Sequence, residues 1–279
     1  MEVFRETALL VWSTPVIVAL ILAEVLWTHF HEVRAYSWRE TLTNCYMAAL
    51  NGSLDVLMRG VVLVAMTFFY QHKLFHLEPG WAYWAGLFVL EDFAYYTLHY
   101  VDHHCRLFWA VHVTHHTSPE FNLSTGFRSS VFQPLYRVAY FAPIAWLGFQ
   151  PLDVLFMYAA TQIYGSLIHT QRVKTLGWLE YVLVTPSHHR VHHASNPRYL
   201  DKNMGMCLIV WDKLFGTFQA EDPVDPPRYG ITKTLVDRGP VNIVLHEWRD
   251  LIRDIRVEAQ NVWERLGFLF RGPGWRPRR

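Results

Sequence analysis

The sequence predicts an all-α integral membrane protein, in which a transmembrane helical bundle carries a cytoplasmic, histidine-rich cap for two metal ions. Three observations predict this fold class. Apolar residues make up 52% of the 279 residues and charged residues only 18%, against about a quarter charged in typical soluble domains. Several apolar runs are long enough to cross a bilayer. Eleven of the 16 histidines lie between His99 and His193.

The composition also limits the class of protein. Twelve Trp and 14 Tyr are more than an ordinary cytosolic enzyme needs, and these rings collect at membrane interfaces. A net charge of +1 gives no indication of a nucleic-acid partner. Cys45, Cys105 and Cys207 are odd in number and far apart, so they predict neither a disulfide framework nor a zinc ribbon. This is typical of a reduced compartment.

Five apolar segments are candidate membrane spans, since a spanning helix needs about 20 residues. The candidates are Thr7–Trp27, Leu54–Tyr70, Trp81–Leu98, Val131–Phe149 and Leu152–Ile168. The last two are separated only by Gln150-Pro151, which predicts a tight helical hairpin. The first lacks the basic region and cleavage site of a signal peptide, so we expect a retained membrane helix.

The third candidate span carries two acidic residues, Glu91 and Asp92. Charged side chains at membrane depth usually face a bundle interior or a polar cavity and mark function. The alternative is that both residues lie near the membrane edge.

The basic residues predict an orientation for the five spans. With the N-terminus outside, only Arg5 and Lys73 lie on the outer side, and the other 23 of the 25 Lys and Arg fall on or near the inner side. Positive charges in short loops stay cytoplasmic. We therefore expect a multi-pass protein with a cytoplasmic active site, in the inner membrane of a bacterium or the endoplasmic reticulum of a eukaryote.

Three regions follow from these patterns: N-terminal membrane helices over residues 1–80, a metal-binding domain over 81–220, and a C-terminal region over 221–279. Within the second, we expect residues 172–220 to form helices lying against the membrane. Apolar residues recur at helical spacing through Val241–Phe270, which predicts an amphipathic helix that either packs on the domain or lies on lipid. The basic tail "RGPGWRPRR" is expected to be disordered.

The histidines fall into boxes whose spacing places them on shared helix faces, because residues i, i+3 and i+4 lie close together. One metal takes roughly four to six ligands, so eight or nine imidazoles predict two metals. The predicted metal ligands are His99, His103, His104, His112, His115, His116, His169, His188, His189, His192 and His193.

The ligand type narrows the metal. Structural zinc usually takes cysteine ligands, and calcium and magnesium want oxygen. Imidazole suits zinc, copper, iron and nickel. Two metals in nitrogen shells at a membrane face favour iron that performs oxygen chemistry. One alternative, a pH-sensing cluster, would set mutually repelling imidazolium ions side by side.

Three further residues are predicted to support the site as catalytic residues. Asp92 lies two helical turns before His99 and could accept a ligand's second ring N–H. Tyr96, three residues before His99, could do the same or line the cavity. Asn122 follows the second box, although ordinary capping or turn formation is the alternative for Asn122 and for Asn203 after the third box.

The sequence also resembles a known family. The resemblance lies in "EDFAYYTLHYVDHH", "WAVHVTHHTSPEFNLSTGFRSS", "LIHTQRVKTLGWLEYVLVTPSHHRVHHASN" and "DKNMGMCLIVWDKLFGTF", which cover about residues 90–218. HxxxHH, HxxHH and HxxHH in this order resemble the fatty acid hydroxylase / sterol desaturase superfamily, and most closely its alkylglycerol monooxygenase-like bacterial members. The resemblance implies a membrane bundle with a cytoplasmic cap, two non-haem irons, molecular oxygen and a lipid substrate. Alkylglycerol monooxygenases carry an acidic residue where this chain has His104, and sterol desaturases carry histidine.

The expected activity is hydroxylation of a lipid C–H bond, on a fatty acyl, ether-lipid or sterol-like substrate. A desaturase with the same two irons is the alternative reaction, and a non-catalytic metal-binding or metal-transporting membrane protein is the alternative class. Transporters place ligands at mid-membrane on broken helices, whereas these boxes sit at helix ends.

A separate electron donor is expected, because the chain has no place for its own. The sequence has no dinucleotide fingerprint, too few cysteines for an iron–sulfur cluster and no haem-attachment motif. A ferredoxin, a small cytochrome or an external reduced pterin are the candidates, the pterin being implied by the resemblance.

Overall fold

The computed structural model describes residues 3–32 and 35–278, and all regular elements in those ranges are helices. The α-helices are α1 (Val3–Phe30), α2 (Trp38–Gln71), α3 (Trp81–His104), α4 (Arg106–His116), α5 (Val138–Leu147), α6 (Pro151–Leu167), α7 (Pro186–His192), α8 (Val210–Phe215), α9 (Pro240–Val257) and α10 (Val262–Phe270). Short 3-10 helices are η1 (Leu123–Phe127), η2 (Gln133–Leu135), η3 (Gly177–Tyr181) and η4 (Pro197–Tyr199). The predicted all-α class is confirmed for this part of the chain.

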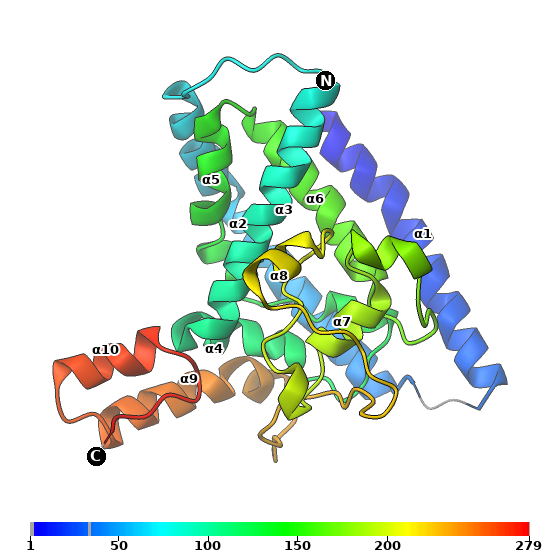
Figure 1. The fold of residues 1–279 in the computed structure, drawn as a ribbon, viewed down its shortest axis with the longest axis vertical. Helices are drawn as coiled ribbons and strands as arrows, with labels where there is room; N and C mark the ends of the chain where they lie inside the picture. Colours follow the sequence, from blue (N-terminus) through cyan, green and yellow to red (C-terminus); the bar gives the residue numbers. More distant parts are fainter. Residues whose placement is uncertain (1–2, 33–34, 279) are drawn as a thin grey trace.

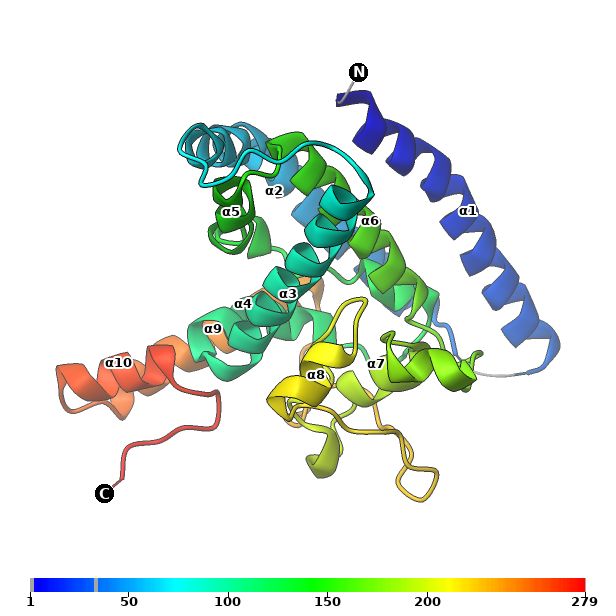
Figure 2. The same cartoon turned by 45° about the horizontal axis from the view of Figure 1, so that its top comes forward.

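The helices form two regions (Figures 1 and 2). The long helices α1, α2, α3 and α6 run lengthwise with the shorter α5. The remaining helices gather at one end, where α3 finishes and α4 begins (Figure 1). The main core lies among α3, α5 and α6 and includes Leu87, Leu98, Phe141 and Val154. The molecule is therefore a helical bundle with a cap at one end.

Two helices, over Arg5–Phe30 and Trp38–Gln71, are long and apolar enough to cross a membrane. This supports membrane association, but the described residues contain two such helices and not the five expected. The segments Trp81–Leu98 and Leu152–Ile168 are helical within α3 and α6 as predicted, with Ile168 capping α6. Glu91 and Asp92 are both fully buried inside the protein, as expected for charged groups that face a bundle interior.

The prediction of a spanning helix over Val131–Phe149 is wrong in its first seven residues. Only α5 is α-helical there, and its ten residues rise about 15 Å, half of the bilayer core. Pro134 stands in η2 and lacks an N–H. In addition, Gln133 and Tyr136 direct their side chains to Asp102. These polar contacts replace the first turns of the expected helix.

The tight hairpin between α5 and α6 is confirmed. Gly148 ends α5 with φ of +118°, and a Cβ there would lie 2.3 Å from Phe75 O, so the corner requires glycine. Pro151 begins α6 at its first position, where a missing N–H costs nothing.

The C-terminal region departs from the sequence-based prediction in two places. The expected amphipathic helix Val241–Phe270 is interrupted after Val257, and α10 starts again behind Asn261, whose side chain accepts from Glu264 N. The predicted disorder of the tail is wrong for the described residues 271–278. Trp275 packs edge-on against Phe268 with centroids 5.3 Å apart, which gives the tail an apolar anchor.

Candidate metal centre

Nine of the eleven predicted ligand histidines gather in two groups in the cap. Group one comprises His99, His103, His112, His116 and His192, and group two comprises His115, His169, His189 and His193. Within each group, one ring nitrogen from every member lies within 4.8 Å of the others. The groups adjoin, because the rings of His116 and His193 stack with centroids 4.6 Å apart. The arrangement therefore offers two neighbouring sites for metal ions.

Each HxxHH box contributes to both groups. On α4, His112 and His116 face group one, whereas His115 faces group two. The helix turns about 100° per residue, so the i+3 and i+4 side chains diverge while i and i+4 stay together. The sequence predicted that each box offers its imidazoles to one point. The boxes instead lie between two points and connect them.

The third box follows the same rule on α7. His189 and His193, four residues apart, face group two, and His192 faces group one. Thr185 is the N-cap residue of α7 and forms a capping box with His188, and Pro186 occupies the first turn. These residues fix the start of α7 and so the direction in which its histidines point.

Backbone carbonyls set the orientation of four rings through their Nδ1 atoms. His99 donates to Met204 O at 2.8 Å and His192 donates to Lys202 O at 2.9 Å. In group two, His115 donates to Arg128 O at 2.9 Å and His169 to Gly165 O at 2.7 Å. A carbonyl only accepts, so the proton is on Nδ1 and the Nε2 lone pair is directed into the group. Ligand histidines in proteins are held in this way.

The inward Nε2 atoms lie at hydrogen-bond distance from one another, and in group two the ring protons cannot serve all of these contacts. His99 and His112 Nε2 lie 3.0 Å apart, and His169 and His189 Nε2 lie 2.9 Å apart. His189 Nε2 is also 3.2 Å from His193 Nε2. One proton on His189 cannot serve both contacts, and a cation between the lone pairs would satisfy all of them. The donor set therefore fits metal ions that imidazole binds, such as iron.

Burial keeps the imidazoles neutral. It lowers the pKa of His115 to about 4 and that of His192 to about 3, although each ring donates to a carbonyl that opposes the shift. Both lie well below the ordinary value of about 6.5. Neutral rings have a free lone pair, so the groups are ready to bind metal at neutral pH.

The other two predicted ligands, His104 and His188, lie outside both groups. His104 donates from Nδ1 to Tyr100 O at 2.9 Å and stacks on the Tyr100 ring. His188 accepts from Thr185 N at 3.3 Å and packs edge-on against Phe218. His188 thus caps the start of α7 and helps to aim the box that follows it.

Asp92 bonds to the segment that follows the third box and not to a histidine. Its carboxylate accepts from Cys207 N at 2.8 Å, Leu208 N at 3.1 Å and Trp211 Nε1 at 2.9 Å. The expected bond from a ligand histidine to Asp92 is therefore not the one that forms. The carboxylate anchors the segment that contains Met204, whose carbonyl receives His99.

Tyr96 and Asn122 bond to groups away from the histidines. Tyr96 Oη lies 3.0 Å from Thr217 Oγ1. Asn122 caps η1, where Oδ1 accepts from Ser124 N at 3.0 Å, the capping role considered as its alternative. Asn203 has φ of +55°, a conformation that asparagine tolerates, and its amide donates to His188 O.

Sequence reasoning missed a buried carboxylate, Asp102, inside the first box. It is fully buried, accepts from Tyr136 Oη at 2.7 Å and lies 3.6 Å from His112 Nδ1. Ser130 Oγ lies nearer, at 3.1 Å from the same nitrogen. Its place in "HYVDHH" was the available signal, because an acidic residue three positions after His99 shares that helix face.

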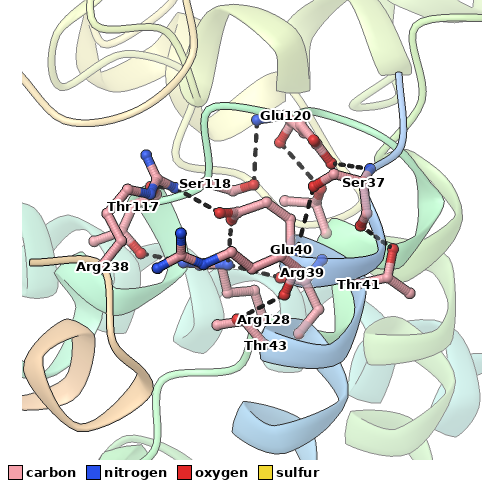
Figure 3. Close-up of polar contacts among 12 residues, drawn as sticks. Ser37, Arg39, Glu40, Thr41, Thr43, Thr117, Ser118, Glu120, Arg128 and Arg238 are labelled. Carbon is pink, nitrogen blue, oxygen red and sulfur yellow. Dashed lines mark hydrogen bonds and ion pairs between the residues drawn. The ribbon is translucent and has the colours of Figure 1, made fainter. Parts of the chain in front are cut away.

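Sequence reasoning also missed Arg128, a fully buried side chain. Its Nε donates to Thr114 O and Thr117 Oγ1 at the end of α4, and its Nη1 donates to Glu40 and Asn44 on α2. Figure 3 shows Glu40 between Arg128 and Arg238. Burial lowers the pKa of Arg128 to about 10, so it remains charged at neutral pH. Its carbonyl receives His115.

Two cavities reach the histidines. The bundle cavity, about 80 Å³, is lined by His112 of group one and by three members of group two, together with side chains from α3 and α6. The outer cavity, about 360 Å³, is lined by His103, His116, His192 and His193, by Trp109, by residues 230–232 and by the C-terminal Pro273-Gly274. Each cavity gives small molecules access to both groups.

Comparison with known proteins supports the resemblance. The family described as fatty acid hydroxylase matches residues 84–217. Human alkylglycerol monooxygenase is 32% identical over 270 residues, 95% of this chain and 59% of that protein. The ornithine lipid hydroxylase of Rhizobium tropici is 31% identical over 142 residues, covering 50% of this chain and 41% of its own length. A delta(7)-sterol 5(6)-desaturase of Gibberella zeae is 26% identical over 171 residues, covering 58% and 50%.

The chain spans about three fifths of the length of the human relative, and no solved structure matches it. The match over residues 84–217 includes both HxxHH boxes and all nine grouped histidines. The similarity to alkylglycerol monooxygenases extends over nearly the whole chain. These matches place residues 84–217 of the chain in the fatty acid hydroxylase superfamily.

Proposed function

We propose that this chain is an O2-dependent, non-haem di-iron membrane hydroxylase that inserts oxygen into a C–H bond of a lipid. One observation carries the proposal: nine imidazoles, eight of them buried and that of His115 half-buried, bring a ring nitrogen each into two adjacent groups, with four of the rings fixed by backbone carbonyls. Similarity to the fatty acid hydroxylase family supports the class of chemistry, and the two histidine groups support the proposed location of the metal ions.

Two iron ions held by these groups would supply the activation of oxygen and the removal of hydrogen from an unactivated carbon. The chain itself contributes ligands, burial and placement. The low pKa values of His115 and His192 keep both rings neutral for binding. Burial of the groups excludes bulk water from the reacting centre.

We propose an ether lipid as the first substrate to test. The chain is similar over 95% of its length to a protein named alkylglycerol monooxygenase. The bundle cavity offers a fitting contact, because Gln162 lines it and the buried Gln162 Nε2 has no hydrogen-bond partner among the described residues. An ether or hydroxyl oxygen beside the reacting carbon would accept from that amide.

His104 does not argue against this substrate. It is the position where alkylglycerol monooxygenases carry an acidic residue, and here its ring stacks on Tyr100 outside both histidine groups. A change of residue at this position leaves the proposed ligands intact.

A separate electron donor completes the reaction, because one atom of oxygen leaves as water and two electrons are needed per turnover. We propose that reducing equivalents reach the groups through the outer cavity, which is lined by Trp109 and three histidines of group one. A reduced pterin, a ferredoxin or a small cytochrome are the candidates.

The proposed location is an integral, multi-pass position in the cell membrane of a bacterium or the endoplasmic reticulum of a eukaryote, with the histidine groups at the cytoplasmic face. The two long apolar helices support membrane association.

Mass spectrometry of lipids from cells with and without the chain tests the reaction. A lipid that gains one oxygen is expected, whereas loss of two hydrogens would indicate a desaturase, the reaction in the name of the Gibberella relative. No change in any lipid, from a chain that still holds metal, would instead favour a non-catalytic metal-binding protein. Metal analysis should find two ions per chain, and a reproducible single ion would contradict the two-metal site.

A further inference from the structure

Helices α9 and α10 form a hairpin that is fixed to the helix carrying the second histidine box. Arg106, at the start of α4, is buried and pairs with Glu247 at 2.8 Å and Asp254 at 2.7 Å on α9. Its backbone N–H donates to Arg271 O, just after α10. The position of the hairpin is therefore tied to α4 and to the histidines on it.

The outer surface of this hairpin is apolar and exposed. On α10, Gly267 and Phe268 are buried, while four apolar side chains at one-turn spacing point outward. Trp263 is 77% exposed and Phe270 is 58% exposed. On α9, Ile252 and Val257 are also exposed, and both line one shallow groove. We call this surface the hairpin face; it comprises Ile252, Val257, Val262, Trp263, Leu266 and Phe270.

Arginines surround the hairpin face. Arg249, Arg253 and Arg256 lie with Ile252 and Val257 along a shallow groove on α9, and Arg265 is exposed on α10. Residues 240–279 contain eight arginines and five carboxylates, a net charge of +3. Arg256 and Arg265 form no ion pair among the described residues. Arginine stems can lie along apolar surface while their heads reach anionic groups.

The hairpin also lies in the right direction for a membrane surface. α9 and α10 run across the end of the bundle, whereas α1, α2 and α3 run lengthwise (Figure 1). α10 lies on the side of α9 that is nearer to the far ends of the long helices (Figure 1). If α1 and α2 cross a bilayer, α10 lies along its surface.

We propose that the hairpin face inserts at the headgroup level of a membrane with anionic lipids, and so fixes the depth of the histidine groups below the bilayer. The inference rests on the membrane location proposed above. A helix with one apolar face, an aromatic anchor and flanking arginines is typical of such binding. A second copy of the chain fits less well, because a two-fold contact would bring two faces of net positive charge together.

Fluorescent labels at single cysteines test the inference in the full chain. Cys45→Ser removes the exposed cysteine, and Cys105 and Cys207 are buried. Leu266→Cys then carries the label on the hairpin face. Val224→Cys, at a valine that is 90% exposed in a loop, is the matched control, and Trp12→Cys on α1 reports whether the chain crosses the membrane. Each protein is reconstituted as one chain per nanodisc with brominated phosphatidylcholine, with or without phosphatidylglycerol.

We expect the label at position 266 to be quenched about fivefold more than the label at 224, with more quenching when phosphatidylglycerol is present. A Trp12 label that is quenched beside an unquenched 266 label would overturn the inference while leaving the membrane location intact. An unquenched Trp12 label would overturn both. Blue-shifted emission at 266 that rises with protein concentration in detergent and is lost in single-chain discs would show self-association and also overturn it.

Removal of the two unpaired arginines tests the charge. Arg256→Ser with Arg265→Ser should weaken insertion in anionic discs by about fivefold for each arginine, with little change in phosphatidylcholine alone. Equal quenching of the 266 label in both kinds of disc, before and after the substitutions, would overturn the proposed anionic partner.

Discussion

The two histidine groups differ in number and in what holds them. Group one has five imidazoles, and the segment 201–204 holds three of them: His99 through Met204 O, His103 through Asp201 and His192 through Lys202 O. Group two has four, and its His189 has a buried Nδ1 with no partner among the described residues.

Access to the groups differs as well. The bundle cavity is lined by three members of group two and only one of group one. A metal ion that takes about six ligands and is held by four imidazoles would keep positions open for oxygen or substrate, as non-haem iron centres do. The outer cavity is lined by three members of group one and one of group two, so each group faces mainly its own cavity. We infer that group one, with one more imidazole, would hold a metal ion more firmly, and that group two, with four, would leave more room for a further ligand.

The largest expected effect comes from removing one ligand in each group. His115→Ala leaves group two with three imidazoles, so metal content should fall from two ions per chain to one. His192→Ala leaves group one with four, which should retain a weakly held ion. Both variants should lose activity by at least about 100-fold. Elemental analysis after mild chelation measures the difference.

His72→Ala, at an exposed histidine far from both groups, is the control and should keep two ions. Equal loss of metal from His115→Ala and His192→Ala would contradict the difference between the groups.

The second prediction concerns Arg128, which positions the carbonyl that receives His115. Arg128→Met removes a buried charge that pairs with Glu40, and we expect the free energy of unfolding to fall by about 3 kcal/mol. Group two should lose metal affinity before group one. Thermal unfolding and metal titration in nanodiscs measure both effects.

Arg238→Met is the matched control for Arg128→Met. Arg238 pairs with the same Glu40 but is partly exposed (Figure 3), so its loss should cost about 1 kcal/mol or less. If both variants destabilise the chain equally, Arg128 has no special part in supporting group two.

The third prediction concerns the stability of the metal-free chain at low pH, which both histidine groups should decrease. The folded pKa values of His115 and His192 lie below the unfolded value of about 6.5. Below pH 6.5 the unfolded chain therefore takes up protons that the folded chain does not. Stability should be complete above pH 6.5 and fall toward pH 4, by about 3 kcal/mol for His115 alone.

Thermal unfolding of the chelated chain at stepped pH measures this loss. The metal-loaded chain should change little until acid releases the metal. A chelated chain with the same unfolding midpoint at pH 7.5 and pH 5 would contradict the burial of neutral imidazoles.

The sequence indicated which histidines lie near one another because their spacing is local. Positions i, i+3 and i+4 lie close together wherever the helix lies, and nine of the eleven predicted ligands lie in the two groups. The division of each box between groups was not predictable, because it depends on how α4 and α7 are rotated against α3. Arg128 had no local signal either, since its partners Glu40 and Asn44 lie more than 80 residues away.

Hydropathy located apolar runs rather than helices. The expected span Leu54–Tyr70 is the second half of α2, which starts at Trp38. The first half is more polar because Glu40, Asn44 and Asn51 bond to Arg128, Ser124 and Ser130 of the protein. Before α5, by contrast, hydropathy predicted a longer helix than the one that forms. The apolar run over residues 131–137 contains Gln133 and Tyr136, whose side chains bond to Asp102.

The fourth prediction concerns the open side of group two. Gln162→Leu removes the unpartnered amide from the bundle cavity while keeping a similar volume. We expect the KM for an ether lipid to rise about tenfold with little change in kcat, as for loss of one hydrogen bond in a dry site. Metal content should stay at two ions per chain. A kcat that falls while KM stays unchanged would contradict a role in holding the substrate.

The smallest expected effect is at His104, the predicted ligand that lies outside both groups. His104→Asp introduces an acidic residue, the type that the resemblance to alkylglycerol monooxygenases implies at this position. The ring of His104 contributes only its stacking on Tyr100 and one bond to Tyr100 O, so stability should change by about 0.5 kcal/mol or less. Metal content should remain two ions per chain and activity should stay within about twofold, because neither group loses an imidazole. Elemental analysis beside turnover of the ether lipid measures both quantities. A loss of metal would indicate that His104 is a ligand of group one. Group one would then have six imidazoles, and the comparison of five with four would be wrong.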